Sequence, residues 1–277
     1  MTVPPPRFRL IGMPTDRNSS FERGAAAGPA AIREALWSER GNAAAECGLE
    51  MGSDFLIDDM GDLPLAEANS DDDLMRDAVA AALANDAVPI SLGGDHAITF
   101  PIFEAIAARH GPVDILHIDA HPDLYDDFEG NPRSHASPFA RIMERGLAGR
   151  LVQVGIRTLN RHCREQAERF GVEVIDMRSF APDRVSAFDR PTYLSIDLDG
   201  IDPAYAPGVA HAEPGGLSVR EVLATLGRVR GPIVGADIVE LNPARDLNGI
   251  TAILAAKLVR EVAARATRNS QSGSRDG

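Results

Sequence analysis

The amino-acid sequence predicts an α/β protein built on a mostly parallel sheet. Several short segments are rich in Val, Ile and Leu at consecutive positions, and segments with helical spacing of apolar residues lie between most of them. Strands that are apolar on both faces are typical of a parallel sheet that helices cover on both sides. A chain of 277 residues is long enough for one large domain of this class.

The predicted strands are distributed along the whole chain. In order, they are Phe8–Met13, Val88–Leu92, Val113–Ile118, Leu151–Ile156, Val172–Met177, Tyr193–Leu198 and Ile233–Leu241. Strands that alternate with helices predict βαβ units with right-handed crossovers. In such a sheet, we expect functional side chains to gather at the carboxyl ends of the strands.

Capping residues and apolar spacing mark the predicted helices. The first opens at Gly28-Pro29, because Pro is favoured at the first helical position, and Ile32 and Leu36 follow at four-residue spacing. A capping box, Ser218-Val-Arg-Glu221, opens a later helix. The other predicted helices cover Leu74–Leu83, Phe103–Ala108, Pro138–Arg145 and a final segment with Ile250, Leu254, Leu258 and Val262 at four-residue spacing.

No internal repeat or flexible linker divides the sequence. We therefore predict one domain over residues 1–268 and a disordered polar tail over residues 269–277. The two cysteines, Cys47 and Cys163, do not form a disulfide framework, and we interpret them as reduced thiols in a cytoplasmic protein. The sequence contains no apolar run long enough to span a membrane and no secretory signal at its start.

The charge of the chain restricts its partners. With 28 Lys and Arg against 41 Asp and Glu, the formal net charge is −13. An acidic surface repels phosphate groups, so we expect no nucleic acid and no anionic membrane as partners. A small cationic substrate is compatible with this charge.

Polar residues that suit a metal site follow three of the predicted strands. These segments are Ser91–His96, His117–Asp126 and Ser195–Pro203. In the second, Asp, His and Asp stand two residues apart, and the third contains an Asp-x-Asp pair. In extended backbone, residues two apart point to the same side, so each set should converge on one face.

Four carboxylates in one cleft repel one another and need positive charge nearby. Carboxylate and imidazole ligands suit Mn²⁺ and its neighbours better than thiolate-preferring metals. One ion with six ligands would satisfy the set, but two ions that share bridging carboxylates use it more naturally. Two such ions could activate water at neutral pH.

These segments resemble the ureohydrolases, a family that includes arginases and agmatinases. The resemblance extends from about Leu10 to Ala266 and is greatest to plant-type arginases. Besides the three metal segments, it rests on Arg23–Arg33, Phe128–Asn131, Ser134–Ser137, Ala206–Ser218, Gly235–Pro243 and Ala255–Glu261. The resemblance implies a three-layer α/β/α sandwich on a mostly parallel sheet, with two bound Mn²⁺ ions, although Ni²⁺ or Co²⁺ would fit the same ligands.

The resemblance also implies roles for individual residues. One ion would be bound by His96 and Asp123, the other by His121 and Asp199, with Asp119 and Asp197 bridging both. Glu240 would bind the guanidinium group, with an ordinary ion pair in the cleft as the alternative. His135 would shuttle a proton, with a loop histidine bonded to backbone as the alternative. Further substrate contacts are assigned to Asn131, Ser137, Asn160 and His211, and His117 is expected to pack beside Asp119 or support it.

The implied reaction is hydrolysis of a guanidino compound to urea and an amine. We predict L-arginine as the substrate, with agmatine, guanidinobutyrate or guanidine as alternatives, since Tyr125 stands where animal-type arginases carry Asn. A two-metal phosphoesterase is disfavoured, because its usual further Asn ligand is missing and Glu240 would repel phosphate. A one-zinc deacetylase and an inactive regulatory subunit are weaker alternatives. Family members suggest a homo-oligomer, either a trimer or a hexamer.

Overall fold

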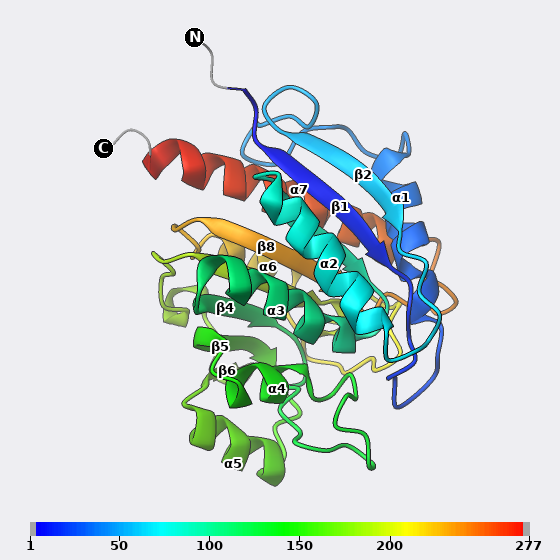
Figure 1. Ribbon diagram of the computed structural model, residues 1–277, viewed down its shortest axis with the longest axis vertical. Coiled ribbons are helices and arrows are strands. Elements are labelled where there is room, and N and C mark those ends of the chain that lie inside the picture. Colours follow the sequence, from blue (N-terminus) through cyan, green and yellow to red (C-terminus); the bar gives the residue numbers. More distant parts are fainter. Residues whose placement is uncertain (1–3, 274–277) are drawn as a thin grey trace.

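The computed structural model describes residues 4–273 and centres on a sheet of eight parallel strands (Figure 1). The strands are β1 (Arg7–Met13), β2 (Leu56–Asp62), β3 (Val88–Gly93), β4 (Val113–Ile118), β5 (Ala148–Ile156), β6 (Glu173–Asp176), β7 (Thr192–Asp197) and β8 (Ile233–Val239). Their order across the sheet is β2-β1-β3-β8-β7-β4-β5-β6. All seven predicted strands are present, and the predicted parallel α/β class is confirmed.

Helices cover both faces of the sheet, which gives the three layers that the resemblance implied (Figure 1). One face packs against α1 (Gly28–Trp37), α6 (Val219–Leu226) and α7 (Ile250–Gly273). The other packs against α2 (Asp71–Ala84), α3 (Thr99–His110), α4 (Pro138–Glu144) and α5 (Arg161–Phe170). Within residues 4–273, no helix is both long and apolar enough to cross a membrane.

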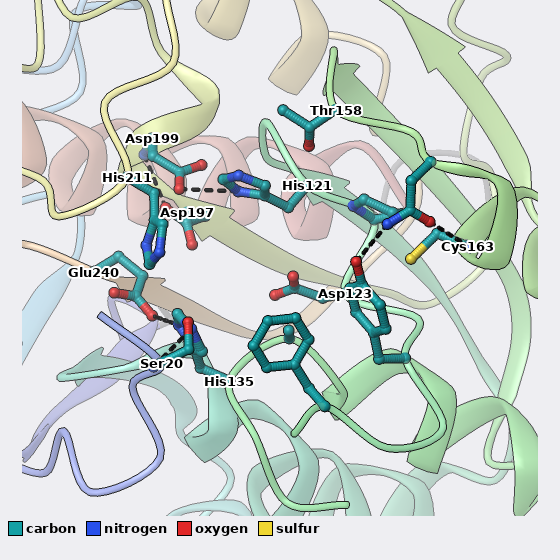
Figure 2. Close-up of a pocket in the computed structure, with 15 residues that line it drawn as sticks. Ser20, His121, Asp123, His135, Thr158, Cys163, Asp197, Asp199, His211 and Glu240 are labelled. Carbon is teal, nitrogen blue, oxygen red and sulfur yellow. Dashed lines mark hydrogen bonds and ion pairs between the residues drawn. The ribbon is translucent and has the colours of Figure 1, made fainter. Parts of the chain in front are cut away.

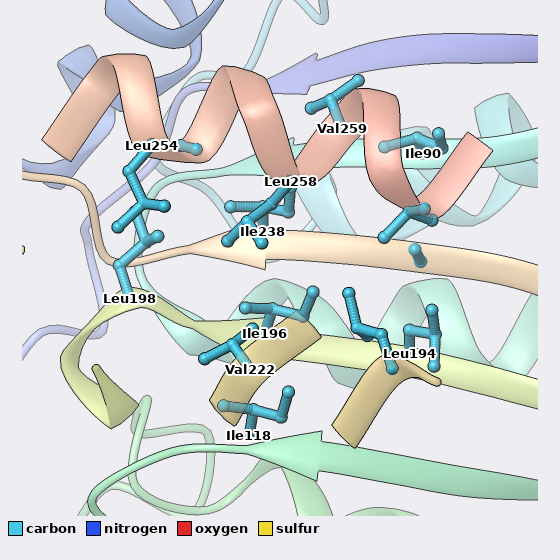
Figure 3. Close-up of a cluster of buried hydrophobic side chains, with 14 of the residues drawn as sticks. Ile90, Ile118, Leu194, Ile196, Leu198, Val222, Ile238, Leu254, Leu258 and Val259 are labelled. Carbon is cyan, nitrogen blue, oxygen red and sulfur yellow. The ribbon is translucent and has the colours of Figure 1, made fainter. Parts of the chain in front are cut away.

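Alternate residues of the inner strands enter two separate cores. Leu10 belongs to the core beneath α7, whereas its neighbour Ile11 belongs to the core beneath α2 and α3. Figure 3 shows Leu258 of α7 lying against the sheet near Ile238 of β8. Full burial of one such aliphatic side chain contributes about 1.5–3 kcal/mol. The apolar strand residues therefore fix the sheet between its helices and hold its carboxyl edge in place.

Two elements were not predicted from the sequence. Strand β2 is an edge strand, only partly buried, and its polar residues lack the continuous apolar pattern of the inner strands. Helix α5 is strongly polar outside one narrow stripe. Its N-cap is Asn160, whose side chain accepts a hydrogen bond from the Cys163 amide at 2.9 Å, and its C-cap is Gly171 in the left-handed region. Both elements lie towards the outside of the fold.

The structure confirms the predicted start of α6 but not the predicted end of α7. The capping box is confirmed, since Ser218 and Glu221 each accept a backbone hydrogen bond from the other. The predicted disorder from residue 269 is wrong for residues 269–273, because α7 continues to Gly273. The Asn269 amide anchors this turn by donating to the carbonyls of Val229 and Gly231, at 3.1 and 2.8 Å. Residues 274–277 lie outside the described residues.

The sheet order brings the predicted site segments together. Strands β3, β8, β7 and β4 are consecutive neighbours, and all are parallel. Their carboxyl ends are therefore adjacent. His96 follows β3, Glu240 follows β8, and Asp119 follows β4, so residues far apart in the sequence meet at one edge of the sheet.

Candidate metal centre and catalytic site

A cavity of about 280 Å³ opens at the carboxyl edge of the sheet (Figure 2). The loops that follow β4, β5, β7 and β8 form its walls, together with the loop between β1 and α1. Among its lining residues are Ser20, His121, Asp123, Tyr125, His135, Asn160, Asp197, Asp199, His211 and Glu240. Most of the predicted site residues therefore surround one space.

One cluster of possible metal ligands centres on His96. Its Nδ1 atom lies 3.2 Å from Asp119 Oδ2, 3.0 Å from Asp123 Oδ2 and 3.2 Å from Asp197 Oδ2. Burial alone would lower the pKa of His96, but these carboxylates raise it well above its usual range. A cation, either a proton or a metal ion, is therefore strongly favoured at this point.

The second cluster centres on His121. Its Nδ1 atom lies 3.1 Å from Asp199 Oδ2 and 3.4 Å from Asp119 Oδ1. Asp119 therefore presents one carboxylate oxygen to each histidine, which is the arrangement that a bridging ligand needs. Asp119, His121 and Asp199 form a group whose ligand atoms lie close enough together to hold one metal ion.

The residues of both clusters fit metal ions. His96 Nδ1 is fully buried and makes no hydrogen bond to any of the described residues. Burial, together with the neighbouring carboxylates, raises the pKa of Asp197 well above its usual range and that of Asp199 to about 6. Loss of solvation is the larger cause and repulsion among the carboxylates adds to it, and divalent cations between the carboxylates would offset both.

The backbone that carries these ligands is not extended throughout, contrary to what the spacing had predicted. Asp119–Asp123 does not continue strand β4 as extended backbone, because the strand ends at Ile118. Asp123 has φ of 48°, and Glu240, which follows β8, has φ of 66°. Both values lie in the left-handed region, which is strained for residues other than Gly. With these backbone conformations, Asp123 and Glu240 both line the cavity.

Surrounding polar residues fix the orientation of two buried histidines. His96 Nε2 lies 2.9 Å from Ser195 Oγ, and Ser195 donates in turn to Asp237 Oδ1 at 2.7 Å. These contacts place the proton of His96 on Nε2 and leave Nδ1 free for a metal ion. His117 lies 2.7 Å from Asp119 Oδ2, and Gln153 donates to its other ring nitrogen. His117 therefore supports Asp119, as one of the two predicted alternatives stated.

His135 and Glu240 form a pair in the cavity wall, beside the His96 cluster (Figure 2). His135 Nδ1 lies 2.9 Å from Glu240 Oε1, and that same oxygen accepts a hydrogen bond from the His96 amide at 2.8 Å. Burial would lower the pKa of His135, but the Glu240 carboxylate raises it to about 9. Burial would raise the pKa of Glu240, but His135 lowers it. The pair is therefore ionised at neutral pH.

The four residues predicted to contact substrate separate into two groups. Asn160 and His211 line the cavity, and the His211 ring centroid lies 5.3 Å from that of His135. Asn131 and Ser137 do not line it. Asn131 instead donates to Asn18 at 3.2 Å and faces a second cavity, whereas Ser137 is fully buried at the start of α4. Their predicted contacts with substrate are not supported by these positions.

Two further residues of the site, Ser20 and Ser195, were not predicted from the sequence. Ser20 lines the cavity and contacts His135, but nothing in its loop sequence marks it. Ser195 lies two residues before Asp197 on the same strand. The two-residue period of a strand places both side chains on the same side, and this signal could have revealed Ser195.

Comparisons with known proteins identify related chains. Residues 6–264 match the sequence model of the Arginase family. The chain is 48% identical over 276 residues to "Arginase 1, mitochondrial" of Arabidopsis thaliana, which covers 94% of this chain and 81% of the relative. It is 38% identical to "Agmatinase, mitochondrial" of Gallus gallus, with 91% and 79% covered.

The fold has a close counterpart among solved structures. The structure of "Arginase from Medicago truncatula" is 44% identical in sequence and superposes with a TM-score of 0.90. The superposition covers 94% of this chain and 87% of the other. The fold of this chain therefore matches a known architecture.

The comparisons also correct the location that we expected for this protein. The expected cytoplasmic location is contradicted, because the arginases of Arabidopsis thaliana, Oryza sativa and Medicago truncatula are named as mitochondrial. The reduced state of two cysteines was too weak an observation to fix a compartment.

The family match, the sequence identity and the structural superposition agree with one another. The chain belongs to the arginase family, the binuclear-metal ureohydrolases that cleave C–N bonds of linear amidines.

Proposed function

We propose that this chain hydrolyses L-arginine to L-ornithine and urea at a centre of two Mn²⁺ ions. The single observation that carries the proposal is the pair of histidine and carboxylate clusters that share Asp119, next to Glu240 and His135. Relatives at 48% identity are named arginases, whereas the agmatinase is 38% identical. This difference favours arginine over agmatine.

The proposed metal ligands are all oxygen or nitrogen donors. One ion would be held by His96, Asp119, Asp123 and Asp197, and the other by His121, Asp119 and Asp199. The family resemblance adds Asp197 as a second ligand shared by both ions. This donor set favours Mn²⁺, and Ni²⁺ or Co²⁺ would also fit it. When bound, the two ions would make water nucleophilic near neutral pH.

Glu240 and His135 would act on the organic part of the substrate. An ionised carboxylate accepts two parallel N–H bonds from a guanidinium group, so Glu240 would orient the reacting carbon. His135, with a pKa of about 9, carries a proton at neutral pH. It would supply this proton to the leaving amine, which is too basic to depart as an anion.

The outer part of the cavity would hold the amino-acid end of arginine. Asn160 donates a hydrogen bond to the Tyr125 hydroxyl there, and His211 faces the same space. We propose Asn160 and His211 as the contacts with this end.

We also propose that the chain forms a homo-oligomer, either a trimer or a hexamer. Light scattering of the purified protein would measure the mass of this assembly.

Urea release from a panel of guanidino compounds tests the proposal. Mn²⁺-loaded protein is given L-arginine, agmatine, 4-guanidinobutyrate or free guanidine. We expect urea and ornithine from L-arginine, and loss of activity by about 100-fold or more in Asp119→Asn and Glu240→Gln. Glu34→Gln, on the exposed surface of α1, is the matched control and should retain full activity.

Two results would contradict the proposal in different ways. Urea from agmatine but not from L-arginine would retain the reaction and overturn the substrate. No urea from any compound, with Mn²⁺, Ni²⁺ or Co²⁺, would overturn the reaction itself.

A further inference from the structure

Both ring nitrogens of His135 are occupied by other groups of the protein. Nδ1 lies 2.9 Å from Glu240, the proposed guanidinium ligand. Nε2 lies 2.8 Å from the Ser20 hydroxyl and 3.2 Å from the Ser20 amide nitrogen. Each nitrogen therefore already has a hydrogen-bond partner within the protein. Ser20 lines the cavity beside His135, as Figure 2 shows, so a residue that contacts the imidazole also borders the space for substrate.

Ser20 can satisfy His135 in both protonation states. When Nε2 is unprotonated, the Ser20 amide donates a hydrogen bond to it. When Nε2 carries a proton, the Ser20 hydroxyl oxygen can accept it. A residue that offers a donor and an acceptor to the same nitrogen is suited to a histidine that gains and loses a proton during turnover.

The loop that carries Ser20 is held firmly against the sheet edge. Asp95, which is fully buried, accepts a hydrogen bond from the Asn18 amide at 2.7 Å. The Asn18 carbonyl accepts one from the His135 amide at 3.1 Å. Gly94 permits this close packing, because a Cβ atom there would lie 1.8 Å from the Thr15 carbonyl oxygen. The position of Ser20 relative to His135 is therefore fixed by the fold on both sides.

We propose that Ser20 relays the proton from His135 to the leaving amine. This inference rests on the proposed function, and it adds a catalytic residue to that reaction. As the C–N bond breaks, its electron pair stays on the amine nitrogen, which takes the proton of the Ser20 hydroxyl. The Ser20 oxygen takes the Nε2 proton of His135 at the same time. Serine ends unchanged, and the imidazole ends neutral.

Ser20→Ala removes the relay and leaves the backbone contact of residue 20 in place. Ser20→Thr retains a hydroxyl, and Ser19→Ala is the matched control, since Ser19 lies in the same loop and is not among the residues that line the cavity. With L-arginine, we expect Ser20→Ala to lower kcat by about tenfold or more, with KM changed less than twofold. Ser20→Thr should recover most of the loss, and Ser19→Ala should match the wild type.

A second substrate separates a relay from a merely structural role. L-Canavanine leaves as an alkoxyamine, which is a much weaker base than an alkylamine and needs less assistance from a proton donor. We expect Ser20→Ala to lower kcat for canavanine by a clearly smaller factor than for arginine. Bound Mn²⁺ per chain, measured by elemental analysis, should equal that of the wild type in all three variants.

The outcomes distinguish this inference from the proposed function. Equal losses for the two substrates, or a kcat of Ser20→Ala within twofold of the wild type, would overturn the relay while the wild type still released urea. A wild type that releases urea from neither substrate would overturn the proposed function, and the relay would fall with it.

Discussion

His135 shows how a buried side chain acquires its charge from its neighbours. Burial disfavours the imidazolium, but Glu240 at 2.9 Å outweighs it and raises the pKa of His135 to about 9. Because this pKa is raised in the folded state, the pair stabilises the fold fully below about pH 6.5. The contribution is lost as the pH rises through about 9. His135 is therefore a proton donor over the neutral range.

Glu240→Gln tests this cause directly. Without the Glu240 carboxylate, burial lowers the pKa of His135, while Asp123 and Asp95 still raise it. We expect the pKa to fall from about 9 towards its ordinary value near 6.5. Nuclear magnetic resonance of the His135 ring, in metal-free protein, would measure it. A pKa that stays near 9 in the variant would show that Glu240 is not the source of the shift.

Individual site residues differed in how far the sequence could predict them. The six proposed metal ligands lie at or just after the carboxyl ends of neighbouring buried strands, so the sheet order alone brings them to one edge. The turn that brings Asp123 to His96 was not predictable, because the backbone after β4 is not extended. Ser20 precedes His135 by 115 residues in an irregular loop, and no periodic pattern connects them. Asn131 was misplaced for the same reason: its loop turns the side chain towards Asn18 and away from the cavity.

At the scale of elements, neighbouring strands cooperate to orient one metal ligand. Ser195 of β7 and Asp237 of β8 are paired in register, and Asp237 also accepts hydrogen bonds from Tyr193 and Thr99, at 2.6 and 2.9 Å. This buried network ends on Nε2 of His96. The two strands therefore hold the imidazole before any ion arrives.

Ser195→Ala should weaken metal binding without removing a ligand. The change leaves the buried N–H of His96 without its acceptor and frees the ring to turn. We expect the affinity for Mn²⁺ to fall about 10- to 100-fold, as measured by competition with a fluorescent chelator. Thr225→Val, at another fully buried hydroxyl in α6, is the control and should bind Mn²⁺ as tightly as the wild type. Equal affinities for Ser195→Ala and the wild type would refute the role of the network.

Buried strands could be predicted from the sequence, whereas the exposed edge strand could not. The inner strands carry apolar residues on both faces because each face lies under helices, and this pattern is visible in the sequence. Strand β2 pairs on one side only and contains Asp58, Asp59 and Asp62, so its sequence resembles a loop. Arg33 of α1 forms ion pairs with Asp59 and Asp62, and these tertiary contacts cannot be seen in a local pattern.

At the scale of the molecule, topology and charge serve the same site. Four adjacent parallel strands deliver their carboxyl ends to one edge, and the loops there carry the buried histidines and carboxylates. The net charge of −13 favours the approach of divalent cations and of a cationic substrate. The fold provides rigidity through two apolar cores, while the loops at the edge provide the chemistry.

The most direct test is urea release from L-arginine while metal-free protein is titrated with Mn²⁺. The two clusters joined by Asp119 predict that the rate rises until two equivalents of Mn²⁺ per chain are bound and then stays constant. Asp119→Asn should release no measurable urea over the same titration. A rate that reaches its maximum at one equivalent, or no urea at any Mn²⁺ concentration, would contradict a two-metal centre that hydrolyses arginine.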